Sequence, residues 1–220
     1  MVNFQFKYSV IYESVPALLV GAKLTILITF FGLVIGFLLG AVFGLFKSAR
    51  SIWLNRLAGL YIESIRGTPL MVQVMFLYFG LPLALGMRVP PLAAGITAIA
   101  LNSGAYIAEI VRGAVESIDK GQTEAGRSIG MSQFQALFYV IWPQAFKRMI
   151  PPLGNQFIIS LKDTSLLVVI GVGELTRQGQ EIIAMNFRSF EVWLTVAFIY
   201  LVMTMSISKV LNITEKKLSI

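Results

Sequence analysis

The chain alternates between long apolar runs and short polar segments. The longest uncharged run extends from Leu24 to Phe46, and a helix needs roughly 20 apolar residues to cross a hydrocarbon core of about 30 Å. A later apolar run contains Lys162 and Asp163 near its middle. The pattern predicts an all-α membrane protein with about five transmembrane helices in a single domain. The predicted spans cover roughly residues 21–46, 67–87, 89–111, 149–173 and 190–209 of the domain 1–220.

Lysine and arginine residues lie mainly on alternate sides of these spans. They are frequent in segments 47–66, 112–148 and 209–217 and sparse in the segments between them. Basic residues near helix ends are retained on the cytoplasmic side of a membrane. We therefore expect the N-terminus outside and the C-terminus inside, with segment 113–147 as a cytoplasmic loop. This distribution accounts for the net charge of +7, so we expect contact with membrane lipid and no nucleic-acid partner.

The chain contains neither cysteine nor histidine. Their absence removes thiolate catalysis and the usual sets of metal ligands. We therefore expect no metal site and no catalytic residues.

The cytoplasmic loop contains the polar stretch GQTEAGRSIG, residues 121–130. Asp119 and Gln122 have the spacing of a helix N-cap with its reciprocal partner, and Gly130 suits the left-handed position that ends a helix. These signals predict a helix of about ten residues, some 15 Å long. Such a helix can dock into a groove on another protein, or it can simply be a solvated connector. It would expose Glu124, Ala125 and Arg127.

A second helix start follows at once, because Ser132 and Gln135 have the spacing of a capping box. Proline removes a backbone donor and clashes with the preceding turn, so Pro143 is expected to end this helix. The apolar face of the second helix is expected to pack beneath the membrane helices. That face consists of Phe134, Leu137, Phe138 and Ile141.

The charges inside the fourth predicted span need compensation, since each costs about 2.5 to 3.5 kcal/mol at the centre of a membrane helix. At helical spacing Gln156, Ser160 and Asp163 form one polar stripe. One interpretation is a substrate site in which Asp163 attracts an ammonium group and Lys162, or a helix N-terminus, attracts a carboxylate. The alternative is that both charges pair with neighbouring helices and only stabilise the bundle.

A further polar stripe runs along the third predicted span through Asn102, Tyr106 and Glu109. It predicts another wall of the substrate path, although Glu109 has the alternative of an ion pair with Arg112 at i+3. In the second span Gln73 either lines the path or bonds across to another helix. Glycines of the first span, which recur at intervals of four residues, are explained by close helix packing. They are Gly32, Gly36, Gly40 and Gly44.

The loop resembles the cytoplasmic signature of binding-protein-dependent ABC importer permeases, which is written EAA, three residues, G, nine residues, I, one residue, LP. Glu124-Ala125-Gly126, Gly130 and Val140 to Pro143 have this spacing. The departures are Gly126 for alanine, Val140 for isoleucine and Trp142 for leucine. The chain is also similar to the polar amino acid branch of these permeases in RGTPL, AYIAEIVRG, GQTEA and LKDTSLL, which begin at residues 66, 105, 121 and 161.

The resemblance implies a membrane-spanning subunit of an ATP-driven importer in the inner (cytoplasmic) membrane of a bacterial cell. The implied partners are two copies of a cytoplasmic ATP-binding subunit, a second permease subunit, with a homodimer expected, and an extracytoplasmic amino-acid-binding protein. The chain lacks the Gly-x-x-x-x-Gly-Lys-Ser/Thr loop, so ATP and magnesium belong to the partner and no cofactor is expected here. The implied coupling residues are Glu124, Ala125, Gly126, Arg127 and Gly130.

The choice of substrate rests on few groups. Asp163 and Glu109 favour basic amino acids such as arginine, lysine and histidine, with glutamine or glutamate as the alternative. From another class of protein, an ATP-independent ion-coupled carrier or channel could use the same buried charges.

Overall fold

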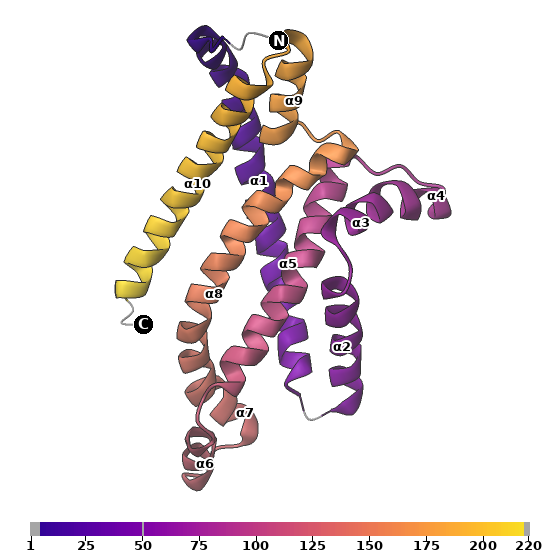
Figure 1. Ribbon diagram of the computed structural model, residues 1–220. Coiled ribbons are helices and arrows are strands. Elements are labelled where there is room, and N and C mark those ends of the chain that lie inside the picture. Colours follow the sequence, from indigo (N-terminus) through magenta and orange to yellow (C-terminus); the bar gives the residue numbers. More distant parts are fainter. Residues whose placement is uncertain (1–4, 50, 218–220) are drawn as a thin grey trace. The chain divides into compact units, whose positions relative to one another are not determined.

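The computed structural model describes residues 5–49 and 51–217, and every regular element within them is a helix (Figure 1). The chain folds as two compact units. Unit 1 comprises Met1–Gly32, Leu70–Ile99 and Ile158–Ile207, and unit 2 comprises Leu33–Pro69, Ala100–Phe157 and Ser208–Ile220. The elements are α1 (Tyr8–Lys47), α2 (Ile52–Arg66), α3 (Leu70–Met75), the π-helix η1 (Phe76–Gly80), α4 (Leu81–Leu85), α5 (Pro91–Glu116), α6 (Lys120–Ser128), α7 (Gln133–Ala136), the π-helix η2 (Leu137–Ile141), α8 (Trp142–Asp163), the 3₁₀-helix η3 (Thr164–Ile170), α9 (Leu175–Asn186) and α10 (Ser189–Lys217).

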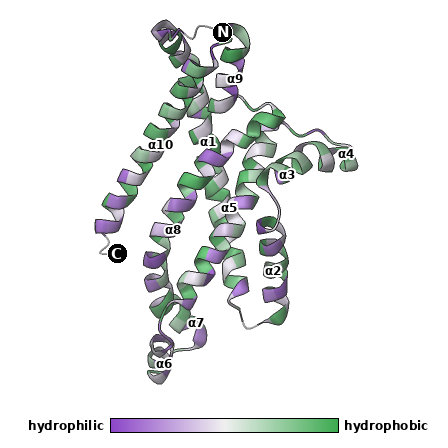
Figure 2. Ribbon diagram, viewed as in Figure 1, coloured by the Kyte–Doolittle hydropathy of each residue, from purple (hydrophilic) through white to green (hydrophobic). Residues whose placement is uncertain are grey.

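The described residues contain four helices long and apolar enough to cross a membrane, and a fifth if α2 and the helices after it form one broken span. Most of α10 is coloured as hydrophobic in Figure 2, whereas α6 is mainly hydrophilic. The first helix begins at Tyr8, well before the predicted start at residue 21. Sequence analysis placed no span over α2, because Arg56, Glu63 and Arg66 interrupt its apolar residues.

Unit 1 contains a buried carboxylate that the sequence analysis missed. Glu174 is the N-cap of α9, and its side chain accepts hydrogen bonds from the N–H groups of Thr176 (2.9 Å) and Arg177 (2.8 Å). The Tyr200 hydroxyl of α10 donates to the same carboxylate (3.0 Å). The N–H of Leu175 donates to Oγ1 of Thr25 on α1 (3.2 Å). These bonds hold the start of α9 against α1 and α10, and burial raises the pKa of the Glu174 carboxyl.

In unit 2, glycines of α1 pack directly on α5, which confirms close packing for three of the four. A Cβ added at Gly40 would lie 2.9 Å from the carbonyl oxygen of Gly104. At Gly44 it would lie 2.7 Å from the carbonyl oxygen of Ala108. At Gly36 it would collide with Oγ of Ser103. The absence of side chains thus lets the two backbones approach closely.

Helix α2 packs on α5 within the same unit. Ala58 and Ile62 form a buried apolar cluster with Ala108. The hydroxyl of Tyr61 donates to the carbonyl oxygen of Leu101 on α5 (2.7 Å). Apolar contact and a hydrogen bond therefore join the middle of α2 to residues 101–108 of α5.

The two π-helices each precede a proline. Leu81 and Trp142, the residues immediately before Pro82 and Pro143, donate their N–H groups to carbonyls five residues back. A wider turn accommodates the ring and the missing donor of proline, which otherwise disrupt a regular helix. The prediction that Pro143 ends the second loop helix was therefore wrong, since helical structure continues from Gln133 into α8.

Candidate functional site

The predicted helix in the cytoplasmic loop is α6, and Asp119 is its N-cap. Oδ1 of Asp119 accepts a hydrogen bond from the N–H of Gly121 (2.7 Å), which confirms the predicted start. The predicted reciprocal role of Gln122 was wrong. Its Oε1 instead accepts a hydrogen bond from Nε2 of Gln144 on α8 (3.2 Å), which joins α6 to the following long helix.

The end of α6 and the start of α7 follow the sequence signals. Gly130 has a φ of 88°, and its N–H donates to the carbonyl oxygen of Arg127 (3.0 Å). The N–H of Met131 donates to the carbonyl oxygen of Gly126 (3.1 Å), which completes a Schellman motif. Ser132 and Gln135 form the predicted capping box. Local capping therefore fixes the sharp turn between the two helices.

One face of α6 is supported by its own chain and the other is exposed. Gly126 is buried against Ala136 and Val140. Glu124, Ala125 and Arg127 are exposed. The loop before α6 is held by Arg148, whose Nη1 donates to the carbonyl oxygen (2.5 Å) and hydroxyl (2.9 Å) of Ser117. The exposed face of α6 is thus presented on a braced support.

Replacing Gly126 by alanine is expected to stabilise the protein by about 0.5–1 kcal/mol, because glycine loses more backbone freedom in a helix. The added Cβ would make ordinary contacts with the Cβ of Ala136 (3.4 Å) and Sδ of Met131 (3.5 Å). Thermal unfolding in detergent measures the shift. Gly130→Ala is the control, since alanine in the left-handed conformation costs about 1–2 kcal/mol. A lower midpoint for Gly126→Ala than for the unchanged protein would contradict this packing.

The apolar face of the second loop helix differs from the prediction. Phe134 and Phe138 are 75% and 55% exposed, so their predicted burial was wrong. Leu137 is half-buried and Ile141 is buried, as expected. The buried positions are spaced by five residues and then by four, because the π-helix widens one turn. They are Ala136, Ile141, Ala145 and Met149.

The predicted polar stripe of α8 lies at the end of that helix. Gln156 and Ser160 are buried one turn apart, and Asp163 is half-buried at the last residue. Lys162 is exposed. Among the described residues, neither Lys162 nor Asp163 takes part in an ion pair. Beyond Asp163 the chain continues as the 3₁₀-helix η3, which ends at Ile170 and is followed by Gly171 with a φ of 77°.

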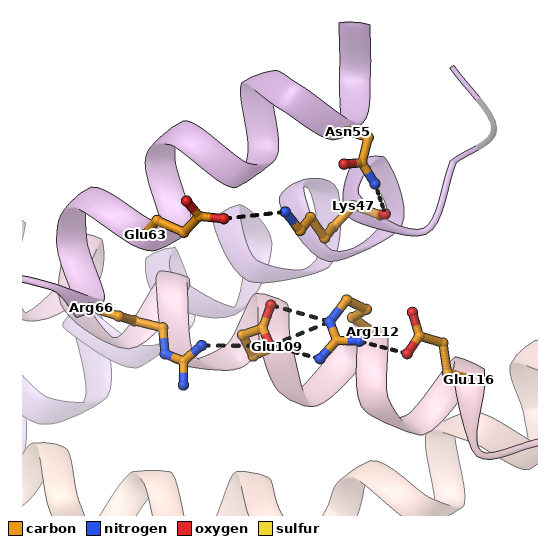
Figure 3. Close-up of polar contacts among 7 residues, drawn as sticks. All are labelled: Lys47, Asn55, Glu63, Arg66, Glu109, Arg112 and Glu116. Atoms are coloured by element: carbon orange, nitrogen blue, oxygen red, sulfur yellow. Dashed lines mark hydrogen bonds and ion pairs between the residues drawn. The ribbon is translucent and has the colours of Figure 1, made fainter. Parts of the chain in front are cut away.

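The three residues of the predicted polar stripe on α5 differ in burial. Asn102 is buried, and Tyr106 is 38% exposed. Glu109 is half-buried and paired with two guanidinium groups (Figure 3). Gln73, on α3 of unit 1, is half-buried.

Glu109 is the centre of an ion cluster in unit 2. Its Oε2 lies 2.9 Å from Nη2 of Arg112 and 3.5 Å from Nη1 of Arg66. Arg112 also contacts Oε2 of Glu116 (2.5 Å). Figure 3 shows these groups beside the pair of Lys47 and Glu63 (3.6 Å). The cluster borders a polar cavity of about 360 Å³ lined by Lys47, Asn55, Ile62, Glu63, Arg66, Glu109, Arg112 and Glu116.

Sequence similarity agrees with the fold. Residues 32–220 match the family described as "Binding-protein-dependent transport system inner membrane component". The glutamine transport system permease protein GlnP of Escherichia coli (strain K12) is 51% identical over 217 residues, which cover 98% of this chain and 99% of GlnP. The L-cystine transport system permease protein TcyL of Bacillus subtilis (strain 168) is 36% identical over 219 residues, covering 97% and 92% of the two chains.

A solved structure is similar over nearly the whole fold. A chain in the crystal structure of "an amino acid ABC transporter with histidines" is 40% identical, with a TM-score of 0.92 over 97% of this chain and 100% of that one. The similarities confirm an inner-membrane transport subunit, since its relatives are transport permease proteins and not enzymes. The chain therefore belongs to the family of inner membrane components of binding-protein-dependent transport systems.

Proposed function

We propose that this chain is the permease subunit of an ATP-driven amino acid importer whose substrate is glutamine. It works as a homodimer with two cytoplasmic ATP-binding subunits and an extracytoplasmic binding protein. The observation that carries this proposal is a short helix, α6, with an exposed face on a braced support, in a chain 51% identical to a glutamine permease. Similarity to GlnP favours glutamine over the basic amino acids expected from the acidic residues.

The ion cluster weakens the argument for basic substrates. Glu109 was one of two carboxylates that favoured them, but Arg66 and Arg112 already neutralise it. Asp163 then remains as the carboxylate for the substrate path. One carboxylate can pair with the α-ammonium group of any amino acid, so it gives no preference for a cationic side chain.

Several features support Asp163 as the substrate's ammonium partner. It lies where α8 changes into a 3₁₀-helix, and interrupted membrane helices commonly form substrate sites. It has no ion-pair partner among the described residues. Ser160 and Gln156, one and two turns before it, carry neutral hydrogen-bonding groups of the kind that recognise an amide. Lys162 is exposed and is the weaker candidate for the substrate carboxylate.

The surface around α6 supports docking of an ATP-binding subunit. Lys147 and Arg148 are exposed charges that suit a membrane boundary. Between residues 129 and 139 of the predicted cytoplasmic segment, four large apolar side chains are exposed. Exposed apolar surface outside the membrane marks contact with another protein. These side chains are Ile129 (75%), Phe134 (75%), Phe138 (55%) and Tyr139 (73%).

Uptake of labelled amino acids into proteoliposomes tests the function. The vesicles hold the permease with its ATP-binding subunit and receive the binding protein outside, with or without ATP inside. We expect ATP-dependent accumulation of glutamine and little of arginine. Accumulation of arginine, lysine or histidine in place of glutamine would overturn the assignment of glutamine as the substrate. Equal uptake with and without ATP would overturn the importer in favour of a carrier.

A further inference from the structure

The contact between Arg66 and Glu109 joins the last residue of α2 to the C-terminal third of α5. We propose that Glu109 is a positioning residue of the transport cycle. By holding Arg66, it links the non-helical segment after α2 to α5, the helix that leads into the cytoplasmic loop. The inference rests on the proposed function, because it assigns a role in coupling ATP hydrolysis to transport.

Arg66 is held by two groups of α5. Its Nη1 lies 3.5 Å from Oε2 of Glu109, and its Cζ lies 5.3 Å from the centre of the Tyr106 ring. Tyr106 and Glu109 are three residues apart, so they lie on one face of α5. A carboxylate and an aromatic face together fix both the charge and the plane of a guanidinium group.

Arg66 also stands at a point where the chain changes direction locally. Helix α2 ends at Arg66, and α3 begins at Leu70. Between them, Pro69 disfavours helical geometry in Thr68. The hydroxyl of Thr68 donates back to the carbonyl oxygen of Ser64 (2.9 Å), which closes the end of α2. A displacement of Arg66 therefore acts directly on the non-helical segment between α2 and α3.

Glu109 in turn is rigidly connected to the coupling loop. Glu109 lies about two helical turns before Glu116, the last residue of α5, so the backbone of the helix itself carries the connection. Helix α5 ends at Glu116, and Asp119, the N-cap of α6, follows three residues later. Movement of α6 by the ATP-binding subunit would consequently displace Glu109.

Stability alone does not explain the Arg66–Glu109 contact. Helices α2 and α5 are already joined by the apolar cluster around Ile62 and by the Tyr61 hydrogen bond. The Arg66 side chain is 42% exposed, and the Glu109 side chain is 22% exposed. Ion pairs that are partly exposed stabilise a fold by at most about 1 kcal/mol. The contact instead adds a link that can be made and broken at little cost.

The test compares Arg66→Gln with the matched variant Arg112→Gln. Each removes one guanidinium group from Glu109, but only Arg66 comes from another helix. Uptake of glutamine and ATP hydrolysis are measured on the same vesicles, with the amount of assembled complex determined for each variant. We expect Arg66→Gln to lower uptake per ATP hydrolysed by about tenfold, as for a typical coupling interaction. Arg112→Gln should lower it by about twofold or less, although Arg112 lies closer to Glu109.

The variant Arg66→Lys keeps the charge but loses the planar group that lies over Tyr106, so it should restore part of the coupling. A structural role would instead lower assembled complex, uptake and hydrolysis in proportion. A substrate role for this cluster would raise the KM for glutamine. Either pattern, or unchanged coupling in Arg66→Gln, would overturn the positioning role while the unchanged protein still imports glutamine. If the unchanged complex shows no ATP-driven uptake, the proposed function fails and this inference fails with it.

Discussion

Replacing Glu124 by lysine is expected to lower ATP-driven uptake by about 10- to 100-fold, because reversing a charge in a docking surface weakens docking by about 1.4 to 2.8 kcal/mol. Glu124 is exposed on α6, so the change should alter the stability of the permease by no more than about 0.5 kcal/mol. Copurification of the ATP-binding subunit with the tagged permease measures docking. Uptake by vesicles with equal amounts of permease measures its consequence.

The control for this prediction is Glu13→Lys. Glu13 is also exposed, but it lies on α1 in unit 1, far along the chain from the cytoplasmic loop. We expect normal docking and uptake for this variant. Normal uptake by Glu124→Lys would remove the coupling role from α6. Equal losses in both variants would show that the effect comes from charge in general.

Enlarging Gly44 is expected to cause the largest loss of stability. An alanine Cβ at this position would lie 2.7 Å from the carbonyl oxygen of Ala108 and 2.7 Å from the Cβ of Val111. The backbone oxygen cannot rotate away, so α1 and α5 must separate within unit 2. We expect Gly44→Ala to destabilise the protein by about 1–3 kcal/mol, and Gly44→Leu by more. The midpoint of thermal unfolding in detergent and the yield of monodisperse protein measure the effect.

Gly113→Ala is the matched control because it is also a glycine of a membrane helix in unit 2. An added Cβ there would meet no atom within 4 Å. Alanine should therefore stabilise α5 by about 0.5–1 kcal/mol. If both substitutions changed the midpoint equally, the close approach of α1 and α5 at Gly44 would not be the cause.

Structural features that depend on neighbouring residues alone were predicted from the sequence. Asp119, Gly130 and the pair Ser132 and Gln135 set the bounds of α6 and the start of α7, because helix caps depend on neighbouring residues alone. Long apolar runs likewise indicated the membrane-spanning helices. The family resemblance of the cytoplasmic loop likewise rested on a short motif, within residues 124–143.

Contacts between distant segments were not predictable in this way. The partner of Glu109 at i+3 was foreseen, but Arg66 comes from a different helix and had no visible relation to it. Glu174 was missed for a similar reason, since its environment is created by Tyr200. The exposure of Phe134 and Phe138 was missed because a regular period of 3.6 residues does not hold across a π-helix.

The wide turn at Leu137–Ile141 has a consequence for the direction in which α6 faces. Each residue of an α-helix adds about 100° of rotation and about 1.5 Å of rise. A turn that accommodates one more residue therefore offsets the preceding chain by roughly a quarter of a revolution relative to α8. Helix α6 packs against this segment through Gly126 and Val140. The direction in which Glu124 faces is therefore set by the extra residue in the π-helical turn and not by any single side chain.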